Sequence, residues 1–408
     1  MKIEIPVNSD FSIHNIPFGI FSTNRKTARV GVAIGDHILD LKRLSEEGIF
    51  KHIEPEVFAQ CSLNKFIALG KEITSKVRTD IQALLLDVNS SVYTISDAFT
   101  SQKDAVMHLP VEIGDYTDFY SSIEHATNVG MMFRDPENAL LPNWKHLPVG
   151  YHGRASSIIV SGQNIHRPKG QTVPKGEQIP QFGPSRLLDF ELETAFIVGK
   201  NTQLGDSIST GQADDFIFGM VLFNDWSARD IQKWEYVPLG PFLGKSFASS
   251  ISPWIVTMEA LEPFRVPGPK QDPAVLEYLS YDGNKNYDIK LQVGIQPLGG
   301  EETTVSNSNF KYMYWNMCQQ LAHHTINGCN VRIGDMMGSG TLSGPDQDSL
   351  GSMLEISWAG SRSVKMKDGT ERKFIQDNDT VIMRGYSEKG TVRVGFGEVR
   401  SQLLPAKQ

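Results

Sequence analysis

The chain has 408 residues, 40% of them hydrophobic and 21% charged, with a formal net charge of −8 at pH 7. This length and composition are typical of a globular protein that buries a large core, in about two or three domains. Nucleic acids and anionic membranes bind clustered Lys and Arg side chains, and the sequence contains no such cluster. Composition therefore argues against both kinds of partner.

No segment is typical of a secreted or membrane protein. Residues 1–6 lack the apolar core of a signal peptide, and no run approaches the roughly 20 apolar residues that span a bilayer. The cysteines Cys61, Cys318 and Cys329 are not spaced as metal ligands. We expect a cytoplasmic protein.

The first elements predicted along the chain belong to a small β-domain. Residues 27–41 alternate on both sides of Gly35 and predict a hairpin. Helical segments are predicted over 64–69 and 73–86.

Near residue 111 the chain becomes rich in Gly, Pro, Tyr and Asp, which indicates a boundary between domains over 1–110 and 111–408. Many short strands separated by Gly and Pro follow, with helices between them, and predict a mainly β, α+β fold. One helix is predicted over 227–235, opened by a capping box from Ser227 to Asp230. A second is predicted over 309–327.

Acidic and apolar residues alternate over 187–198. A strand there places Asp189, Glu191 and Glu193 on one face and apolar side chains on the other. Neighbouring carboxylates repel each other, so we expect a positive group between them. Oxygen ligands suit calcium or magnesium better than zinc. A solvated strand face is the simpler alternative.

The segment after this strand carries polar groups in a helical pattern. Asp225 ends the apolar run 216–224, a common place for a ligand or catalytic group. Arg229, Gln232 and Tyr236 share one helical face. Beside an acidic cluster, these groups suit an anionic, oxygen-rich small molecule. An amphipathic surface helix is the alternative.

A nucleotide-binding loop is excluded at residues 240–246, because three residues, not four, separate Gly240 from Gly244-Lys245-Ser246. Lys245 would instead hold a carboxylate or a developing oxyanion. His125, close in sequence to Asp118 and Tyr120, is the best candidate base, and a structural histidine is the alternative.

These segments together resemble the fumarylacetoacetate hydrolase family over essentially the whole chain. The resemblance lies in four blocks, residues 113–120, 141–154, 224–243 and 351–355. It implies an N-terminal SH3-like barrel, a catalytic β-roll and a homodimer. It also implies metal-dependent hydrolysis of a carbon–carbon bond in 4-fumarylacetoacetate, giving fumarate and acetoacetate, the last step of tyrosine and phenylalanine catabolism.

Alternatives remain within and outside this reaction. One is a hydrolase, decarboxylase or hydratase of the same superfamily that acts on another acylpyruvate or 2-oxo acid. Another is a calcium-binding structural protein, against which His125, Glu355 and Lys245 argue, because a structural ion site needs none of them.

The resemblance further implies a role for each candidate residue. His125 is the general base and Glu355 orients it, while Arg229, Gln232 and Lys245 stabilise the oxyanion. Substrate contacts fall on Tyr120, Arg134, Tyr151, Gln232, Tyr236 and Thr341. Calcium ligands fall on Asp118, Glu191, Glu193 and Asp225, with Asp189 only a neighbour. A magnesium position falls on Asp225, Lys245 and Ser249, where the family has threonine.

Overall fold

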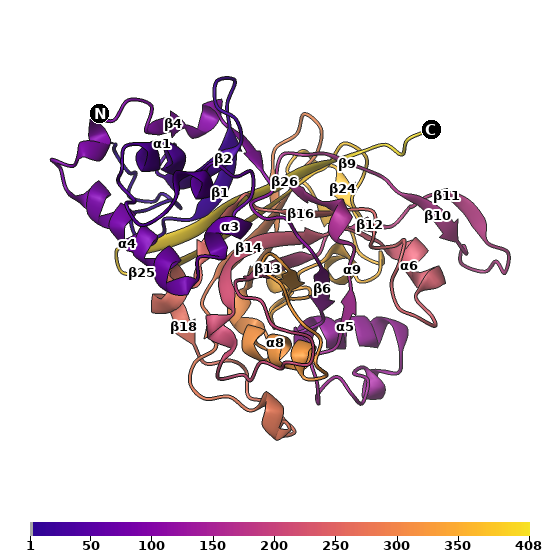
Figure 1. The fold of residues 1–408 in the computed structure, drawn as a ribbon. Coiled ribbons are helices and arrows are strands. Elements are labelled where there is room, and N and C mark those ends of the chain that lie inside the picture. The colour runs from indigo at the N-terminus through magenta and orange to yellow at the C-terminus, as the bar shows by residue number, and fades with distance from the viewer. Residues whose placement is uncertain (1–2) are drawn as a thin grey trace.

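The computed structural model describes residues 3–408 and shows a mixed α/β fold with large sheets (Figure 1). The larger sheet has 13 strands, and its main path runs β4-β3-β2-β1-β17-β14-β13-β22-β6-β7. In chain order these strands are β1 (Phe18–Ser22), β2 (Arg29–Ile34), β3 (His37–Asp40), β4 (Phe99–Ser101), β6 (Tyr116–Phe119), β7 (Gly150–His152), β13 (Leu192–Val198), β14 (Ile217–Asp225), β17 (Trp254–Thr257) and β22 (Met336–Gly338). Three further strands branch from it, β5 (Val106–His108), β8 (Ile158–Val160) and β16 (Ser249–Ile251).

A second sheet of five strands packs against the first. Its order is β21-β20-β25-β26-β9, with β9 (Ile165–His166), β20 (Lys290–Gln296), β21 (Thr303–Asn309), β25 (Thr380–Lys389) and β26 (Val392–Leu404). The long strand β26 crosses β14, β16 and β17 (Figure 1). Leu222, Val293 and Phe396 from the two sheets lie in one buried core.

The N-terminal segment contains the predicted hairpin and helices. β2 and β3 pair antiparallel, which confirms the hairpin. Helices α3 (Asn64–Ile67) and α4 (Lys71–Leu86) confirm the predicted helical segments, and α1 (Leu41–Glu46) and α2 (Pro55–Phe58) precede them. β1 pairs antiparallel with β17, so this segment joins the main sheet. In the described residues, β4 lies at the end of the sheet order β4-β3-β2-β1, so these strands do not close into a barrel there. An SH3-like barrel stays a prediction.

The helix predicted over 227–235 begins two residues later, as α6 (Arg229–Glu235). Ser227 lies instead in β15 (Ser227–Ala228), and the N-cap residue Ala228 supplies no side-chain cap. The capping-box prediction is therefore wrong. Asp230 instead accepts hydrogen bonds from the Ser185 hydroxyl at 2.6 Å and the Arg186 N–H at 2.8 Å. Its carboxylate therefore binds a distant segment and does not cap the start of the helix.

The helix predicted over 309–327 is also shorter, as α8 (Met317–Thr325). Its start is set by a capping box between Asn316 and Gln319, which satisfies the first backbone N–H groups. Of the predicted residues upstream, Asn309 ends β21, which pairs with β20, and Phe310–Tyr312 form a separate 3-10 helix. The remaining helices are α5 (Ile123–Phe133), α7 (Met258–Leu261) and α9 (Met353–Ile356).

Within residues 3–408, no helix combines the length and apolar character needed to cross a membrane.

Candidate active site

The strand predicted over 187–198 is interrupted in the structure. It forms β12 (Leu188–Asp189) and β13, and between them Glu191 bridges Ser352. The break arises because β12 pairs with β15, whereas β13 pairs with β14 and β22. Asp189, Glu191 and Glu193 are 0%, 5% and 0% exposed. The solvated-face alternative is therefore wrong.

Four carboxylates meet where neighbouring strands lie side by side. Glu193 is on β13, Asp225 ends β14 and Asp118 is on β6, and the sheet order β14-β13-β22-β6 brings them together. One oxygen of each, with one of Glu191, lies within 4.8 Å of all the others. Gly338 of β22 leaves the space they need, because a Cβ there would lie 2.9 Å from Asp118 Oδ1.

Two of these carboxylates are paired with cationic side chains. Glu191 Oε1 lies 2.8 Å from Arg229 Nη1, and its other oxygen contacts Lys245. Asp225 Oδ2 lies 2.7 Å from Lys245 Nζ. Burial would raise the pKa of Glu191, but the positive charges of Lys245 and Arg229 outweigh it and hold that pKa below its usual value.

The other two carboxylates lack such partners. Among the described residues, Asp118 Oδ1 and Glu193 Oε1 accept no hydrogen bond. Burial raises the pKa of both carboxyls well above the usual value, and neighbouring carboxylates add to the rise. A buried set of oxygen donors with this excess of negative charge suits a hard metal cation.

His125 on α5 is held by a buried carboxylate from the far end of the chain. Its Nδ1 lies 2.6 Å from Glu355 Oε2, and the two residues are 3% and 1% exposed. Burial would raise the pKa of Glu355, but His125 and the hydrogen bonds around the carboxylate lower it below its usual value. An ionised Glu355 accepts a hydrogen bond from Nδ1–H, so the proton stays on Nδ1 and Nε2 is the nitrogen free to act as a base.

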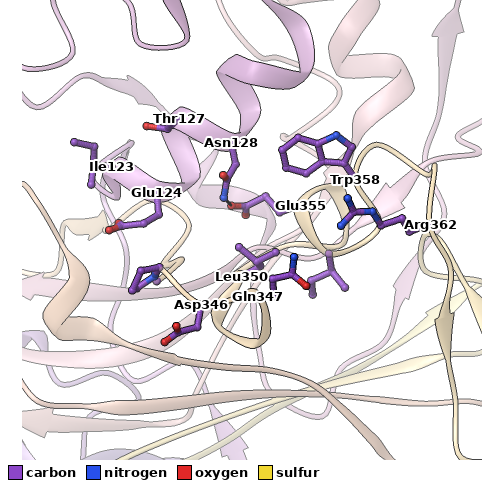
Figure 2. A pocket seen from close by; sticks show the side chains of 13 residues that line it. Ile123, Glu124, Thr127, Asn128, Asp346, Gln347, Leu350, Glu355, Trp358 and Arg362 are labelled. Carbon is purple, nitrogen blue, oxygen red and sulfur yellow. Dashed lines mark hydrogen bonds between the residues drawn. The ribbon is translucent and has the colours of Figure 1, made fainter. Parts of the chain in front are cut away.

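Further donors fix Glu355. Asn128 Nδ2 donates at 3.0 Å, and the hydroxyls of Ser343 and Ser352 each donate at 2.9 Å. Asn128 and Glu355 also line a separate cavity of about 530 Å³ (Figure 2). The Glu355 carboxylate is thus held from several directions.

A cavity of about 540 Å³ joins the histidine to the acidic cluster. The candidate residues that line it are Asp118, Tyr120, His125, Arg134, Tyr151, Glu191, Glu193, Arg229, Gln232, Tyr236, Lys245 and Thr341. Asp225 and Ser249 line a smaller cavity of about 180 Å³, which shares Lys245 and Tyr151 with the larger one. Glu355 lies behind His125.

Sequence reasoning missed several residues that shape this site. Ser352 carried a signal, because Ser352-x-x-Glu355 is a capping-box pattern, and its Oγ accepts from the Glu355 N–H at 3.3 Å. Asn128 lies on α5 three residues after His125 and Ser343 lies in a loop, and no local pattern indicated that either would contact Glu355. Gly340, with φ +77, donates its N–H to Glu193 Oε2 at 3.0 Å, which a residue with a Cβ would do only under strain.

The fold and site together are those of an enzyme class in which a buried histidine–carboxylate pair lies beside a cluster of carboxylates suited to a metal cation. The family model described as fumarylacetoacetate hydrolase C-terminal matches residues 116–403. The model described as fumarylacetoacetase N-terminal matches residues 14–110. The chain belongs to the fumarylacetoacetate hydrolase family.

Individual relatives agree with this assignment. The chain is 52% identical to fumarylacetoacetase of Homo sapiens over 99% of this chain and 98% of that protein. A fumarylacetoacetate hydrolase of Exiguobacterium antarcticum has a similar fold, with a TM-score of 0.54 and 19% identity over 96% of this chain and 100% of that one. So does a maleylpyruvate hydrolase of Sphingobium in complex with manganese(II) and pyruvate, with a TM-score of 0.53, 15% identity and coverage of 96% and 100%.

Proposed function

We propose that the chain catalyses the hydrolysis of 4-fumarylacetoacetate to fumarate and acetoacetate, the last step of tyrosine and phenylalanine catabolism. The observation that carries this proposal is that His125, which Glu355 holds from behind, lines one cavity together with Asp118, Glu191 and Glu193 of the acidic cluster. The 52% identity to human fumarylacetoacetase over 99% of the chain supports the choice of substrate.

In the proposed reaction, His125 Nε2 removes a proton from a water molecule, which attacks a carbonyl of the diketone. Glu355 holds the imidazole in the required tautomer and stabilises its charged form. The new carbon–oxygen bond forms first and gives a tetrahedral oxyanion. When the carbonyl re-forms, the carbon–carbon bond breaks, and the leaving acetoacetate carbon takes up the proton that His125 carries.

Charge on the attacked carbonyl oxygen needs donors in the same cavity. Arg229, Gln232 and Lys245 line it and would receive this oxyanion. Asp118, Glu191, Glu193 and Asp225 would hold a calcium ion, which when bound supplies Lewis acidity to the diketone oxygens.

The substrate's terminal carboxylates would lie toward the mouth of the cavity. Arg134 is exposed there, and a planar guanidinium matches a carboxylate. Tyr120, Tyr151, Gln232, Tyr236 and Thr341 would complete the substrate contacts. We place a magnesium ion near Asp225, Lys245 and Ser249, where the Ser249 hydroxyl lies 2.8 Å from Asp225 Oδ1.

The proposed assembly is a homodimer. Ile179 and Phe182, in the hairpin of β10 (Lys169–Thr172) and β11 (Gln181–Pro184), are 78% and 76% exposed, and the hairpin extends from the body of the molecule (Figure 1). Exposed apolar side chains on a projecting arm suit burial against a second copy. Sedimentation of the Phe182→Ser variant as a monomer, beside a wild-type dimer, would support this interface.

Other proposals concern organisation. Domains over 1–110 and 111–408, the first an SH3-like barrel and the second a β-roll, are supported by the separate family models that match 14–110 and 116–403. A cytoplasmic location without nucleic-acid or membrane partners stays a prediction from composition.

A spectrophotometric assay with fumarylacetoacetate tests the proposed function. Purified protein should remove the diketone absorbance, a chelator should abolish turnover, and calcium or magnesium should restore it. Absence of turnover by folded, metal-replete protein would overturn the proposal, and acylpyruvates and 2-oxo acids would then be tested as substrates.

A further inference from the structure

Asp189 is a buried carboxylate outside the metal-type cluster. It ends β12, is 0% exposed, and is not among the four cluster residues. Its oxygens contact two separate parts of the site, the side chain of Arg229 on α6 and the first turn of α9. The sequence indicated only that Asp189 neighbours the calcium ligands, and it did not indicate these two contacts.

The first contact orients a cationic side chain. Asp189 Oδ2 lies 2.9 Å from Arg229 Nε and 2.8 Å from Nη2. Glu191 Oε1 holds Nη1 at 2.8 Å. Because carboxylates hold the planar guanidinium on both sides, its orientation at the cavity depends on Asp189 as much as on Glu191.

The second contact orients the turn that carries Glu355. The N–H groups of Met353 and Leu354 donate to Asp189 Oδ1 at 2.7 Å and to Oδ2 at 2.9 Å. α9 spans only four residues, so its first N–H groups have no partner inside the helix. Asp189 supplies that partner, and Glu355 is the next residue along the chain.

We propose that Asp189 is a positioning residue that holds Arg229 and the Glu355 turn in one rigid unit. The inference rests on the proposed function, in which Arg229 receives the oxyanion and Glu355 orients the base. A misplacement of about 1 Å at reacting groups costs on the order of 100-fold in rate. Loss of the Asp189 contacts should therefore slow the reaction although Asp189 itself lines no part of the described cavity wall.

Asp189→Asn keeps the size of the side chain but turns one acceptor into a donor that faces N–H groups. A matched control is Asp379→Asn. Asp379 is 1% exposed, contacts Arg372 Nε at 2.7 Å and Nη2 at 2.8 Å, and accepts the Gln376 N–H at 2.9 Å. It has the same kinds of partner but does not line the cavity.

We expect Asp189→Asn to lower kcat about 100-fold with KM changed less than about threefold, and Asp379→Asn to keep kcat within about threefold. Glu355→Gln provides the second half of a double-mutant cycle. In that background Asp189→Asn should cost much less than in the wild type, because part of its effect passes through Glu355. If Asp189→Asn lowered kcat by the same factor in the wild type and in Glu355→Gln, the proposed action of Asp189 through Glu355 would be overturned.

Amide hydrogen exchange gives a readout that is independent of substrate. Asp189→Asn should lower protection over residues 351–356, and Asp379→Asn should not. Unchanged protection there would overturn the inference. A wild-type protein that lacks turnover would overturn the proposed function, while the exchange result would still decide whether Asp189 holds α9.

If the Asp189→Asn variant does not fold, a second pair of variants tests the same contact. Asp189→Asn combined with Arg229→Gln removes both charges of the ion pair and leaves no new unpaired charge at residue 229. Compared with Arg229→Gln alone, the double variant should lose protection over residues 351–356. Equal protection in the two proteins would overturn the contact with α9.

Discussion

Glutamate side chains in this one site differ in pKa according to what surrounds them. His125 and hydroxyl donors outweigh burial and hold the pKa of Glu355 below its usual value, and Lys245 and Arg229 do the same for Glu191. Burial and neighbouring carboxylates raise the pKa of Glu193. Cationic and hydrogen-bonding partners, not residue type, therefore separate Glu355 and Glu191 from Glu193.

His125→Asn should abolish turnover, by about 1000-fold or more, because it removes the imidazole that takes the proton from water in the proposed reaction. Calcium binding should persist, since His125 is not in the acidic cluster. Calorimetric calcium titration and the diketone assay on one preparation check this. His166→Asn, at an exposed position, is the control. Full activity of His125→Asn would remove His125 from the mechanism.

Glu191→Gln with Glu193→Gln should weaken calcium binding by at least about 100-fold, because two anionic ligands become neutral. Glu46→Gln with Glu47→Gln changes the net charge equally at exposed positions and should leave the affinity unchanged. Calcium titration of both double variants measures the two affinities. If the two variants bound calcium equally tightly, the ion would not be held by Glu191 and Glu193.

At the scale of elements, an ion-pair network ties together segments far apart in the sequence. Asp214, in the short helix Ala213–Asp215, accepts from Arg265 at 3.1 Å and Lys285 at 2.7 Å. Burial would raise the pKa of Asp214, but the hydrogen bonds and charges of these two residues lower it below its usual value of 3.8. The ionised Asp214 carboxylate therefore stabilises the folded state fully at pH values above 3.8. This stabilisation is lost as pH falls through the lower pKa that Asp214 has in the folded state.

Asp214→Asn should reduce the free energy of unfolding by about 1 kcal/mol at pH 7, because the pairs are partly exposed. The difference from wild type should shrink as pH falls below about 4, when the wild-type carboxyl also becomes neutral. Urea unfolding at several pH values measures it. A difference that does not depend on pH would contradict the ion-pair explanation.

At the scale of the whole molecule, the segment over 1–110 is not an independent attachment. Phe18 and Phe66 share a core with Ile197, Val221 and Ile255 on strands of the later segment. The opposite face of β13, including Phe196, lies in the core against the second sheet. Both faces of the central strands are therefore buried. The N-terminal segment covers one face, and the second sheet covers the other.

We expect the chain to unfold in a single transition. All six tryptophans lie at or after residue 144, and Trp254 packs against Phe21 and Ile38, so their fluorescence reports on the later segment and on its contact with the earlier one. Hydrogen exchange over residues 18–40 reports on the earlier one. The denaturant midpoints of the two signals should coincide. A lower midpoint for residues 18–40 would show that the N-terminal segment unfolds separately.

Local patterns predicted some elements well and others poorly. The alternation over 187–198 placed Leu188, Phe190 and Phe196 in one apolar core, as the structure shows. The predicted extent of the helix ending near Gly328 was wrong, because β21 runs to Asn309, a 3-10 helix follows, and the Asn316 cap sets the start of α8. The local pattern carried no information about either partner.

The sequence by itself determined the family, the apolar and acidic faces of the central strand, and which residue types gather at the site, because these depend on residue identity and short spacing. Only the tertiary structure decided which carboxylate is paired with a cation and which lies between Arg229 and α9. These contacts join distant residues, 164 positions apart for Asp189 and Met353. Strand order and burial set such distances, and no local spacing encodes them.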